Sequence, residues 1–528
     1  MLTTSFGYKG AFTAPHRIAA LAGQKVLAEG GTAIEAMVSA AATIAVVYPH
    51  MNGMGGDGFW LVRQKGQKPV GISACGRAAM RATPHWYRDR NCSVIPPRGA
   101  LAAVTVPGTI AGWAKALDLV PEGRRLPLSR LLAPAIDYAA EGIAVSQNQA
   151  VTTAGKADEL KDVDGFADIY LPGGALPAAG SRLRQEALAS TLRHLAQHGL
   201  DSFYRGAIAE ANARFLEQAG SPLQLADFNR FDAERVEPLS VTTRWGRLFN
   251  MTPPTQGVSA LMILALYDRL LQDEACCSAD HIHLLVEATK QVFILRNGGL
   301  GDPDHMADAA SNWLAPDRLD ALARRVDRGQ ALAWPHVAKP GDTIWMGAAD
   351  SEGTVVSFIQ SVFWEFGSGL TSPQTGIQFQ NRGSAFSLNP GPNQLRPGAR
   401  PFHTLNPAMA ELRDGRLMAY GTMGGEGQPQ TQAAVFTRHV HHGMPLQAAI
   451  TAPRWLLGRT WGEDSTTLKL EGRFDMQTVE TLRQRGHATE LLADFSDAMG
   501  HAGAAILHPD GLIEAATDPR SDGAALAF

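Results

Sequence analysis

The sequence predicts an α+β fold, in which paired strands form the centre of a layered sandwich and helices cover both sides. Two observations lead to this prediction. Residues 343–350 and 354–362 have the pattern of strands around an Asp-Ser-Glu-Gly turn, and the second is rich in β-branched and aromatic residues. Helical patterns fill much of the chain before residue 343 and return near residues 431–442.

The front of the chain alternates helices with glycine-rich turns. Residues 14–29 have helical periodicity and stop at a Gly-Gly pair, and residues 32–35 form a capping box that starts an alanine-rich helix ended by Pro49. The glycine-rich loop 52–58 precedes a strand over 59–62 and lacks the Gly-Lys-Ser/Thr of a phosphate-binding loop. We therefore expect this loop to pack tightly against another backbone segment.

The middle of the chain is predominantly helical. Between residues 126 and 228 we expect several amphipathic helices, followed by two long helices over 258–273 and 280–296. The charged, alanine-rich stretch 315–333 is the best candidate for a mobile linker. Beyond the hairpin, a further strand is expected near 504–507.

The composition is typical of a globular chain and does not favour a nucleic-acid-binding or membrane protein. The 528 residues are 45% hydrophobic and 19% charged, with a net charge of -4 and a pI near 6.5. The longest apolar run, residues 36–48, is too short to span a bilayer, and residues 1–15 carry no export signal. The four cysteines form no C-x-x-C pair, so we expect a reducing, cytoplasmic location.

Thr343, at the head of the first predicted strand of the hairpin, has two interpretations. Threonine is a good strand former, so the residue can be purely structural. Alternatively, its hydroxyl attacks the carbonyl of Asp342, hydrolysis of the ester frees the Thr343 amine, and that amine becomes the base for the same hydroxyl. A Pro-Gly pair at 340–341 precedes this candidate cleavage junction. The local pattern leaves both interpretations open.

Two further loops are candidate sites. The loop around Gly424 and Gly425 contains paired glycines, which let backbone N–H groups point at a developing oxyanion, although a plain turn has the same composition. The Pro-bounded loop 401–407 offers a hydroxyl and an imidazole.

The histidines do not predict a metal site. His281 and His283 are two residues apart in a helical pattern and face apart, and the cluster over 439–442 lies at a helix end, where histidines interact favourably with the helix dipole. No third ligand stands at a standard spacing. We expect no metal and no cofactor.

Taken together, these motifs resemble those of the gamma-glutamyltransferase family of N-terminal nucleophile hydrolases, along nearly the whole chain. Residues 29–36 are similar to the family's E-G-G-N-A-V-D-A, and residues 54–59 to its L-G-G-G-G-F. The Val-Pro-Gly-Thr at 106–109 and the Asp-Pro-Arg-Ser at 518–521 match as well. Several ordered motifs at compatible spacing make this resemblance specific.

The resemblance implies both a fold and a catalytic centre. It implies a four-layer αββα sandwich with Thr343 as the nucleophile and Gly424 and Gly425 as the oxyanion glycines. It further implies self-cleavage into a large subunit, 1–342, and a small subunit, 343–528, which stay associated and can form a homo-oligomer of heterodimers.

The chain departs from the family where familial transferases hold the amino-acid group of the substrate. Two of the family's three residues for the α-amino group correspond to Phe363 and Arg382, and the third, an acid, is replaced by alanine. A substrate ammonium would therefore meet a cation. The family's Ser-Ser pair becomes His403 and Thr404, and Arg77 follows the segment that matches the family's F-R-E.

These departures predict a self-processing amidohydrolase for a small amide that carries a carboxylate, because arginine suits bidentate carboxylate recognition. The pattern resembles the branch of the family that includes oxamate-hydrolysing enzymes of purine breakdown, which implies conversion of oxamate to oxalate and ammonia. The alternative in the same fold is a gamma-glutamyl hydrolase or transpeptidase acting on glutathione-like substrates. Arg382 can instead form a structural ion pair.

The expected site residues divide by role. The catalytic group comprises Thr343, Ser361, Gly424 and Gly425; the substrate-binding group comprises Arg382, His403, Thr404, Phe363 and Arg77; and cleavage falls between Asp342 and Thr343. Two other classes stay open, a metal-dependent amidohydrolase that uses the histidines and an uncleaved homologue that acts only by binding.

Overall fold

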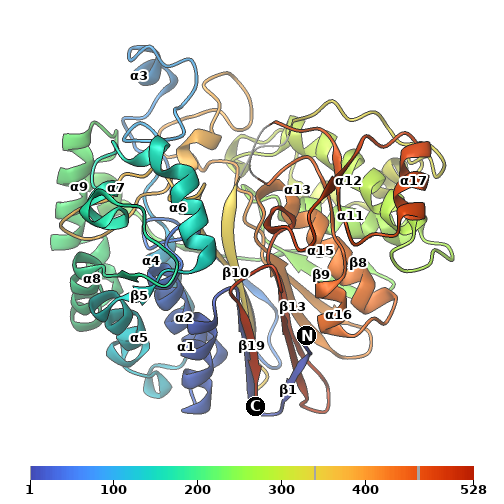
Figure 1. Ribbon diagram of the computed structural model, residues 1–528, viewed down its shortest axis with the longest axis horizontal. Helices are drawn as coiled ribbons and strands as arrows, with labels where there is room; N and C mark the ends of the chain where they lie inside the picture. The colour runs from blue at the N-terminus through green and yellow to red at the C-terminus, as the bar shows by residue number, and fades with distance from the viewer. Residues whose placement is uncertain (1, 338–340, 461–463) are drawn as a thin grey trace.

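Two seven-stranded sheets lie face to face at the centre of the structure (Figure 1). The computed structural model describes residues 2–337, 341–460 and 464–528. The first sheet has the order β1 (Ser5–Gly7), β18 (Ile513–Thr517), β17 (Ala502–Leu507), β13 (Leu417–Thr422), β12 (Ala408–Leu412), β9 (Gly246–Asn250) and β8 (Leu239–Thr243). The second has the order β19 (Ala524–Ala527), β2 (Gly10–Ala14), β10 (Asp342–Asp350), β11 (Val355–Phe363), β3 (Asp57–Arg63), β4 (Val70–Ala74) and β7 (Glu234–Val236).

Helices cover the outer face of each sheet (Figure 1). The second sheet is covered by the layer of α1 (Arg17–Ala28), α2 (Ala33–Val47), α4 (Thr109–Leu117), α5 (Leu128–Glu141) and α8 (Glu186–His198). The first sheet is covered by α11 (Gly257–Leu270), α12 (Ala279–Gly299), α15 (Gln428–Phe436) and α16 (Leu446–Thr451). The predicted αββα layering is therefore confirmed.

The remaining elements lie around this sandwich. They are α3 (Pro84–Arg88), α6 (Gln147–Leu160), α7 (Phe166–Tyr170), α9 (Ala207–Ala219), α10 (Leu225–Arg230), α13 (Ala310–Trp313), α14 (Pro316–Ala323), α17 (Met476–Gln484), and the short strands β5 (Ile143–Ala144), β6 (Arg182–Leu183), β14 (Trp455–Leu457), β15 (Leu468–Glu471) and β16 (Thr489–Leu492). None of the described helices is long and apolar enough to cross a membrane.

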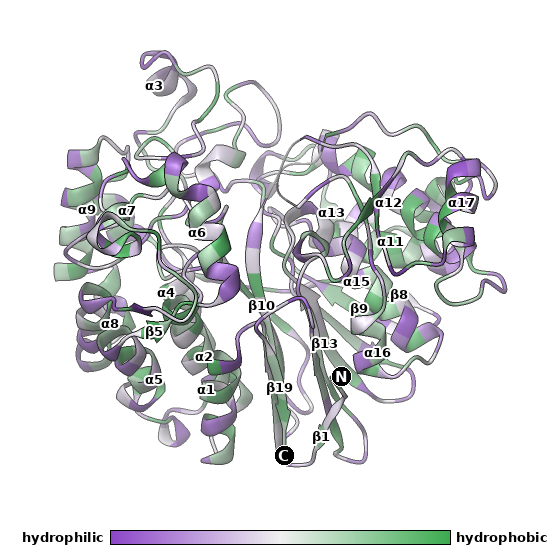
Figure 2. Cartoon of the chain, viewed as in Figure 1, coloured by the Kyte–Doolittle hydropathy of each residue, from purple (hydrophilic) through white to green (hydrophobic). Residues whose placement is uncertain are grey.

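Three apolar cores lie between the four layers and hold them together. Phe12 and Trp60 belong to the core on the α1 and α2 side, Trp345 to the core between the sheets, and Tyr420 and Phe436 to the core on the α11 and α12 side. Figure 2 shows hydrophobic and hydrophilic residues mixed along the outer helices, such as α5 and α8. Burial of the apolar faces is the main force that stacks the layers.

The front motifs fold as the sequence predicts. Thr32 accepts the Glu35 N–H at 3.3 Å while the Glu35 carboxylate accepts the Thr32 N–H at 2.8 Å, so the capping box starts α2. A Cβ on Gly55 would lie 2.0 Å from the Gln378 carbonyl oxygen, and one on Gly56 would lie 2.1 Å from a backbone oxygen of β11. Only glycine permits this approach, so the loop serves tight backbone packing as expected.

Three local predictions need correction or fall on residues that the structure does not describe. The stretch 315–333 is not a simple linker, because α14 forms within it and buries Leu319 and Leu322 against the α11 and α12 core. The helix predicted over 431–442 begins earlier, at Gln428, and ends in a π-helical turn. Pro340, of the predicted Pro-Gly lead-in, lies outside the described residues.

The parts of the chain before and after residue 343 are interwoven in both sheets. Strand β10 pairs with β2 on one side and β11 on the other, and β11 in turn pairs with β3. In the first sheet, β12 pairs with β9 and β18 with β1. A cut at the Asp342–Thr343 bond would therefore leave two fragments held together by shared sheets and cores.

Candidate active site

Thr343 lies at the start of β10, in the middle of the second sheet. Its side chain is fully buried. The pairing of β10 with β11 is irregular here, because Asp342 faces Phe363 whereas Ile344 faces Gln360. Such irregularities re-aim side chains next to active sites. The local backbone thus separates Thr343 from the regular ladder that follows it.

Two hydroxyl groups donate to the carbonyl oxygen of Asp342 across the continuous Asp342–Thr343 bond. One is the hydroxyl of Thr343 itself, and the other is the Ser361 hydroxyl, at 2.6 Å. The Ser361 oxygen is fixed in turn, since it accepts the Phe363 N–H at 2.7 Å. This arrangement puts a nucleophilic oxygen beside the bond and a donor on the oxygen that would gain charge during attack.

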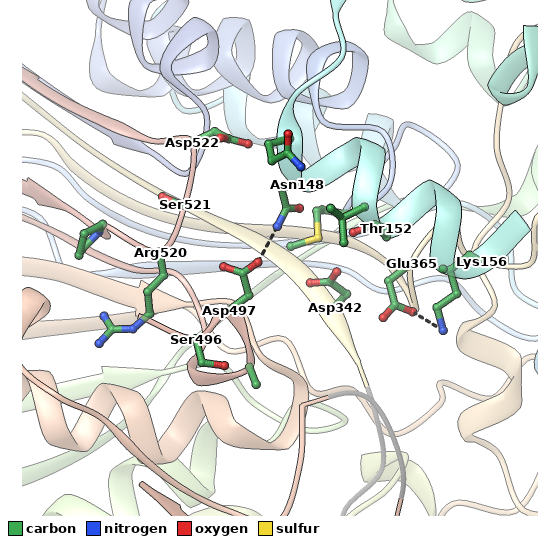
Figure 3. A pocket seen from close by; sticks show the side chains of 16 residues that line it. Asn148, Thr152, Lys156, Asp342, Glu365, Ser496, Asp497, Arg520, Ser521 and Asp522 are labelled. Carbon is green, nitrogen blue, oxygen red and sulfur yellow. Dashed lines mark hydrogen bonds and ion pairs between the residues drawn. The ribbon is translucent and has the colours of Figure 1, made fainter. Parts of the chain in front are cut away.

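The Asp342 side chain faces a cavity of about 650 Å³ on the α6 side (Figure 3). Its carboxyl accepts the Thr343 N–H at 2.7 Å. Burial and the nearby Glu365 raise the pKa of Asp342 well above its usual value, which favours the neutral acid. Lys156 lies 3.6 Å from Glu365, and Asp497 accepts a hydrogen bond from α6 across the same cavity. The junction is thus reached from this cavity on its Asp342 side.

The glycine loop between β13 and α15 lies against the junction. Gly424 and Gly425 have φ values of 120° and 52°, in the region that favours glycine. A Cβ on Gly425 would lie 3.0 Å from the Gly341 carbonyl oxygen, so the two backbones touch. Among the described residues, neither the Gly424 nor the Gly425 N–H has an acceptor. The loop can therefore offer free N–H groups beside the scissile segment.

A buried polar network holds this loop in place, and the sequence analysis missed it. The side chain of Gln256 donates to the carbonyls of Gly425 and Thr404, at 2.8 and 2.9 Å. Arg296 donates to the Gln256 side-chain oxygen at 2.9 Å and pairs with Glu426 at 2.5 Å. Nothing local in the sequence marks Gln256 or Arg296, because their partners lie far along the chain.

Arg382 is fully buried and has an unused edge. Its Nη1 donates to the Thr404 hydroxyl at 3.4 Å, whereas Nε and Nη2 have no partner among the described residues. The same two atoms of Arg130 hold the Glu29 carboxylate at 2.7 and 2.6 Å. The open edge of Arg382 is thus the edge with which arginine binds a carboxylate side-on. The alternative of a structural ion pair for Arg382 finds no partner in the described part of the chain.

Phe363 and Thr404 position the Arg382 guanidinium. The Phe363 ring lies 3.8 Å from the guanidinium carbon and covers its flat face, which leaves the N–H edge open. Phe363 has a φ of 87°, a conformation that non-glycine residues adopt at a cost and mainly near functional sites. Its ring also lies 3.3 Å from where a Cβ of Gly341 would be. Arg382, Phe363 and the scissile segment are therefore neighbours.

His403 and Asp57 form a buried hydrogen-bonded pair close to Arg382. His403 Nε2 lies 3.0 Å from Asp57 Oδ2, and both side chains are fully buried. Burial, with Arg382 as the second cause, lowers the pKa of His403 well below its usual value, so the imidazole is neutral. Asp57 was not among the predicted site residues. Its replacement of a glycine in the family's L-G-G-G-G-F pattern was the available signal.

The structure does not bring Arg77 together with the other predicted residues. Its Nη2 pairs with Glu234 at 2.7 Å and its Nη1 donates to the Gly398 carbonyl at 3.1 Å. The side chain lines a separate cavity of about 290 Å³ beside Phe231. Its use in substrate binding stays a prediction that this geometry does not favour.

His281 and His283, the histidine pair singled out in the sequence, are engaged in protein hydrogen bonds. His281 accepts the Cys277 N–H and reaches the Thr437 hydroxyl at 3.0 Å, so both ring nitrogens are used. His283 contacts His487 and the Asp327 carbonyl. Three groups of described side chains have potential metal-ligand atoms close together: Cys276, His281 and His442; Asp57, Cys75 and His403; and His283, Glu287 and His487. Existing hydrogen bonds account for the histidines of the last group and the carboxylate of the second.

Comparison with known proteins agrees with this geometry. A profile described as Gamma-glutamyltranspeptidase matches residues 19–528. The oxamate amidohydrolase proenzyme of Klebsiella pneumoniae is 51% identical over all of both chains, and a glutathione hydrolase-like proenzyme of Bacillus subtilis is 39% identical over 99% of both. The crystal structure of cephalosporin acylase from Bacillus halodurans superposes with a TM-score of 0.92, at 32% identity, over 100% of this chain and 97% of that one.

These matches confirm the resemblance drawn from the motifs, because they span nearly the whole chain and include relatives above 30% identity. They also agree with the four-layer fold and with a chain made as a proenzyme. The chain therefore belongs to the gamma-glutamyltranspeptidase family, as one of its self-processing N-terminal nucleophile amidohydrolases.

Proposed function

We propose that this protein cuts itself between Asp342 and Thr343 and then hydrolyses oxamate to oxalate and ammonia. The large subunit would be residues 1–342 and the small subunit residues 343–528. The observation that supports this best is the unused Nε and Nη2 edge of the buried Arg382. A desolvated guanidinium with a free side-on edge suits a carboxylate that the protein does not itself supply.

Self-cleavage would use the contacts around the Asp342 carbonyl. The Thr343 hydroxyl attacks the carbonyl carbon, Ser361 donates to the developing oxyanion, and the peptide nitrogen leaves as the Thr343 amine. The neutral Asp342 carboxyl, which lies 2.7 Å from that nitrogen, passes a proton to it and takes up the proton that the Thr343 hydroxyl loses. Water then hydrolyses the ester. Departure of Gly341 from Gly425 would open the space next to the glycine loop.

Hydrolysis of oxamate would then repeat the same chemistry on an external amide. The Thr343 amine takes the hydroxyl proton as the oxygen attacks the amide carbon, and the proton passes to the departing nitrogen, which leaves as ammonia. The acyl-enzyme ester is hydrolysed by water to oxalate. Arg382 holds the carboxylate, while Phe363 restricts the length of the substrate. Thr404 and His403 complete the wall beside Arg382.

During oxamate hydrolysis, the N–H groups of Gly424 and Gly425 would stabilise the oxyanion that forms on the way to the acyl-enzyme and again when water attacks it. Gly424→Val is expected to lower kcat by about 10²-fold or more, the scale of losing one oxyanion donor. Steady-state ammonia release measures this loss. Gly424 suits the test because its nearest neighbours lie 3.5 Å or more from a built Cβ. Gly443→Val is the control, since Gly443 also has a positive φ of 69° with open space around it. A Gly424→Val enzyme that turns over normally would remove the loop from the mechanism.

The alternative substrate class is a γ-glutamyl compound such as glutathione. Its α-ammonium group would face Arg382, and the neighbouring Ala385 offers no acid to bind it. Ammonia release from oxamate, compared with anilide release from a γ-glutamyl anilide, separates the two classes. We expect turnover of oxamate and little or none of the anilide. The reverse preference would contradict the proposed substrate.

We also propose a cytoplasmic role in nitrogen scavenging from purine breakdown. All four thiols are free, and the sulfurs of Cys276 and Cys277 lie 3.7 Å apart without a disulfide, which suits a reducing compartment. A homo-oligomer of the two-fragment unit stays a prediction, which light scattering on the purified protein would test.

A further inference from the structure

Three departures from the family pattern meet at one buried place. Asp57 replaces a glycine and His403 replaces a serine. Arg382 occupies a position at which familial transferases bind the α-ammonium group of their substrate. All three side chains are fully buried, and they come from β3, the loop before β12 and the segment after β11. An acid, an imidazole and a guanidinium buried together form a charged cluster whose parts compensate one another.

Asp57 is held by hydrogen bonds on both oxygens. Its Oδ1 accepts the N–H groups of Gly76 and Gly108, at 2.9 and 3.1 Å, and the side-chain amide of Gln380, at 3.0 Å. Its Oδ2 faces His403 Nε2 at 3.0 Å. Two of these four donors are backbone groups and one is an amide that cannot titrate. Of the partners of Asp57 in the described part of the chain, His403 is thus the one that can exchange a proton.

Asp57 is the main source of negative charge for Arg382 in the described residues. Burial lowers the pKa of Arg382 to about 9, and Asp57 is the first group that opposes this. Arg382 forms no salt bridge with any described residue, so Asp57 acts on it across the cluster without direct contact. Cys75 and Tyr204 are further titratable side chains near Asp57, and burial raises the pKa of both, which keeps them neutral.

We propose that Asp57 is the counter-ion of Arg382 in the empty enzyme, and that the substrate carboxylate replaces it in this role while Asp57 takes up a proton through His403. The inference rests on the proposed function, because it needs an anionic substrate at Arg382. Without the exchange, the bound state would hold two carboxylates against one guanidinium in a buried site, an arrangement that like-charge repulsion disfavours.

The proton can reach Asp57 by a change of tautomer. Because an ionised Asp57 can only accept, the neutral His403 must carry its proton on Nε2, which lies 3.0 Å from Asp57 Oδ2. The Nδ1 of His403 has no partner among the described residues. A proton from solvent binds Nδ1, and the Nε2 proton moves to Asp57 Oδ2. The products are a neutral carboxyl and a neutral imidazole protonated on Nδ1, so one proton is taken up per carboxylate bound.

Because binding of the carboxylate is coupled to uptake of a proton, the affinity for oxamate depends on pH. Burial raises the pKa of Asp57 to about 7, with the hydrogen bonds and Arg382 opposing. Below this value Asp57 is already neutral, and oxamate binds without proton uptake. Above it, each binding event must also bind a proton, so the affinity for oxamate falls by up to about tenfold per pH unit. A neutral amide of the same size, oxamide, has no such dependence.

The test compares Asp57→Asn with the parent enzyme on oxamate and oxamide. The ratio of kcat/KM for oxamate, variant over parent, is expected to rise up to about tenfold between about pH 6 and about pH 8, through KM. The ratio for oxamide is expected to stay flat. The Thr343 amine is present in both enzymes, so the effect of its titration cancels in the ratio. Asp350→Asn is the control, because Asp350 is also buried, accepts backbone N–H groups and has a raised pKa.

If Asp57→Asn fails to fold, a second measurement on the unmodified enzyme tests the exchange of counter-ion at Arg382. Infrared difference spectra on adding oxalate at about pH 8 should show the C=O stretch of a newly protonated carboxyl, to which an amine cannot contribute. The counter-ion exchange would be overturned if the ratio of kcat/KM for oxamate, variant over parent, did not change with pH, or if the spectra lacked that band. Oxamate turnover by the parent enzyme would not be affected by either result. A parent without oxamate turnover at any pH would instead overturn the proposed function.

Discussion

Thr343→Ala is expected to stay one intact chain and to release no ammonia from oxamate. Without the hydroxyl, nothing attacks the Asp342 carbonyl, so the chain is not cleaved. The variant therefore has neither the free α-amine at residue 343 nor the nucleophilic hydroxyl. The loss should reach the background rate, because one residue supplies both the nucleophile and the base. A denaturing gel and an ammonia assay measure the two effects together.

Thr343→Ser is the informative companion, since serine keeps the hydroxyl that both steps require. It is expected to cleave and to retain measurable turnover. Thr354→Ala serves as the control for removal of a threonine from the same hairpin, because Thr354 lies at its far end beside Asp350. Turnover of oxamate by Thr343→Ala would remove Thr343 from the chemistry.

Arg382→Ala is expected to lower kcat/KM for oxamate by roughly 30- to 5000-fold, the effect of about 2–5 kcal/mol for a desolvated charge partner. Self-cleavage should persist, because it uses only the chain's own Asp342 carbonyl. Arg382→Lys should recover little, since an ammonium group cannot reproduce the side-on edge. Steady-state kinetics on oxamate, a longer ω-amide acid and oxamide give the comparison.

The matched control for this variant is Arg438→Ala. Arg438 is equally buried but lies beside Cys277, away from the junction, so its removal creates a similar cavity elsewhere. It should leave the preference for oxamate over oxamide unchanged. If Arg382→Ala lowered kcat/KM for oxamide as severely as kcat/KM for oxamate, Arg382 would be a structural residue and would not bind the substrate carboxylate.

Local sequence patterns predict the elements of this fold better than their arrangement. The capping box at Thr32 and the glycines at 55 and 56 could be interpreted directly, because their effects act within a few residues or through backbone contact. The sheet order could not, since β2 and β3 flank the hairpin from more than 250 residues away. The α+β layering therefore needed the ordered family motifs.

The site shows the same limit. Thr343 and the glycine loop stand out through their motifs, and Arg382 stands out as a departure from the family. Asp57 did not, because its meaning depends on His403, which is 346 positions away in sequence. Arg77 stays a predicted substrate-binding residue, and its pairing with Glu234 could not be predicted from the sequence because the two residues meet only in the folded chain. Burial and long-range hydrogen bonds decide which charged side chains are free to bind a substrate.

The most direct test of this account is N-terminal sequencing, with intact mass, of the purified protein. The account predicts two fragments, residues 1–342 and 343–528, that copurify because both sheets contain strands from each. The small fragment should begin Thr343-Ile344-Trp345. A single intact chain that hydrolyses oxamate, or a new N-terminus at any residue other than Thr343, would contradict it.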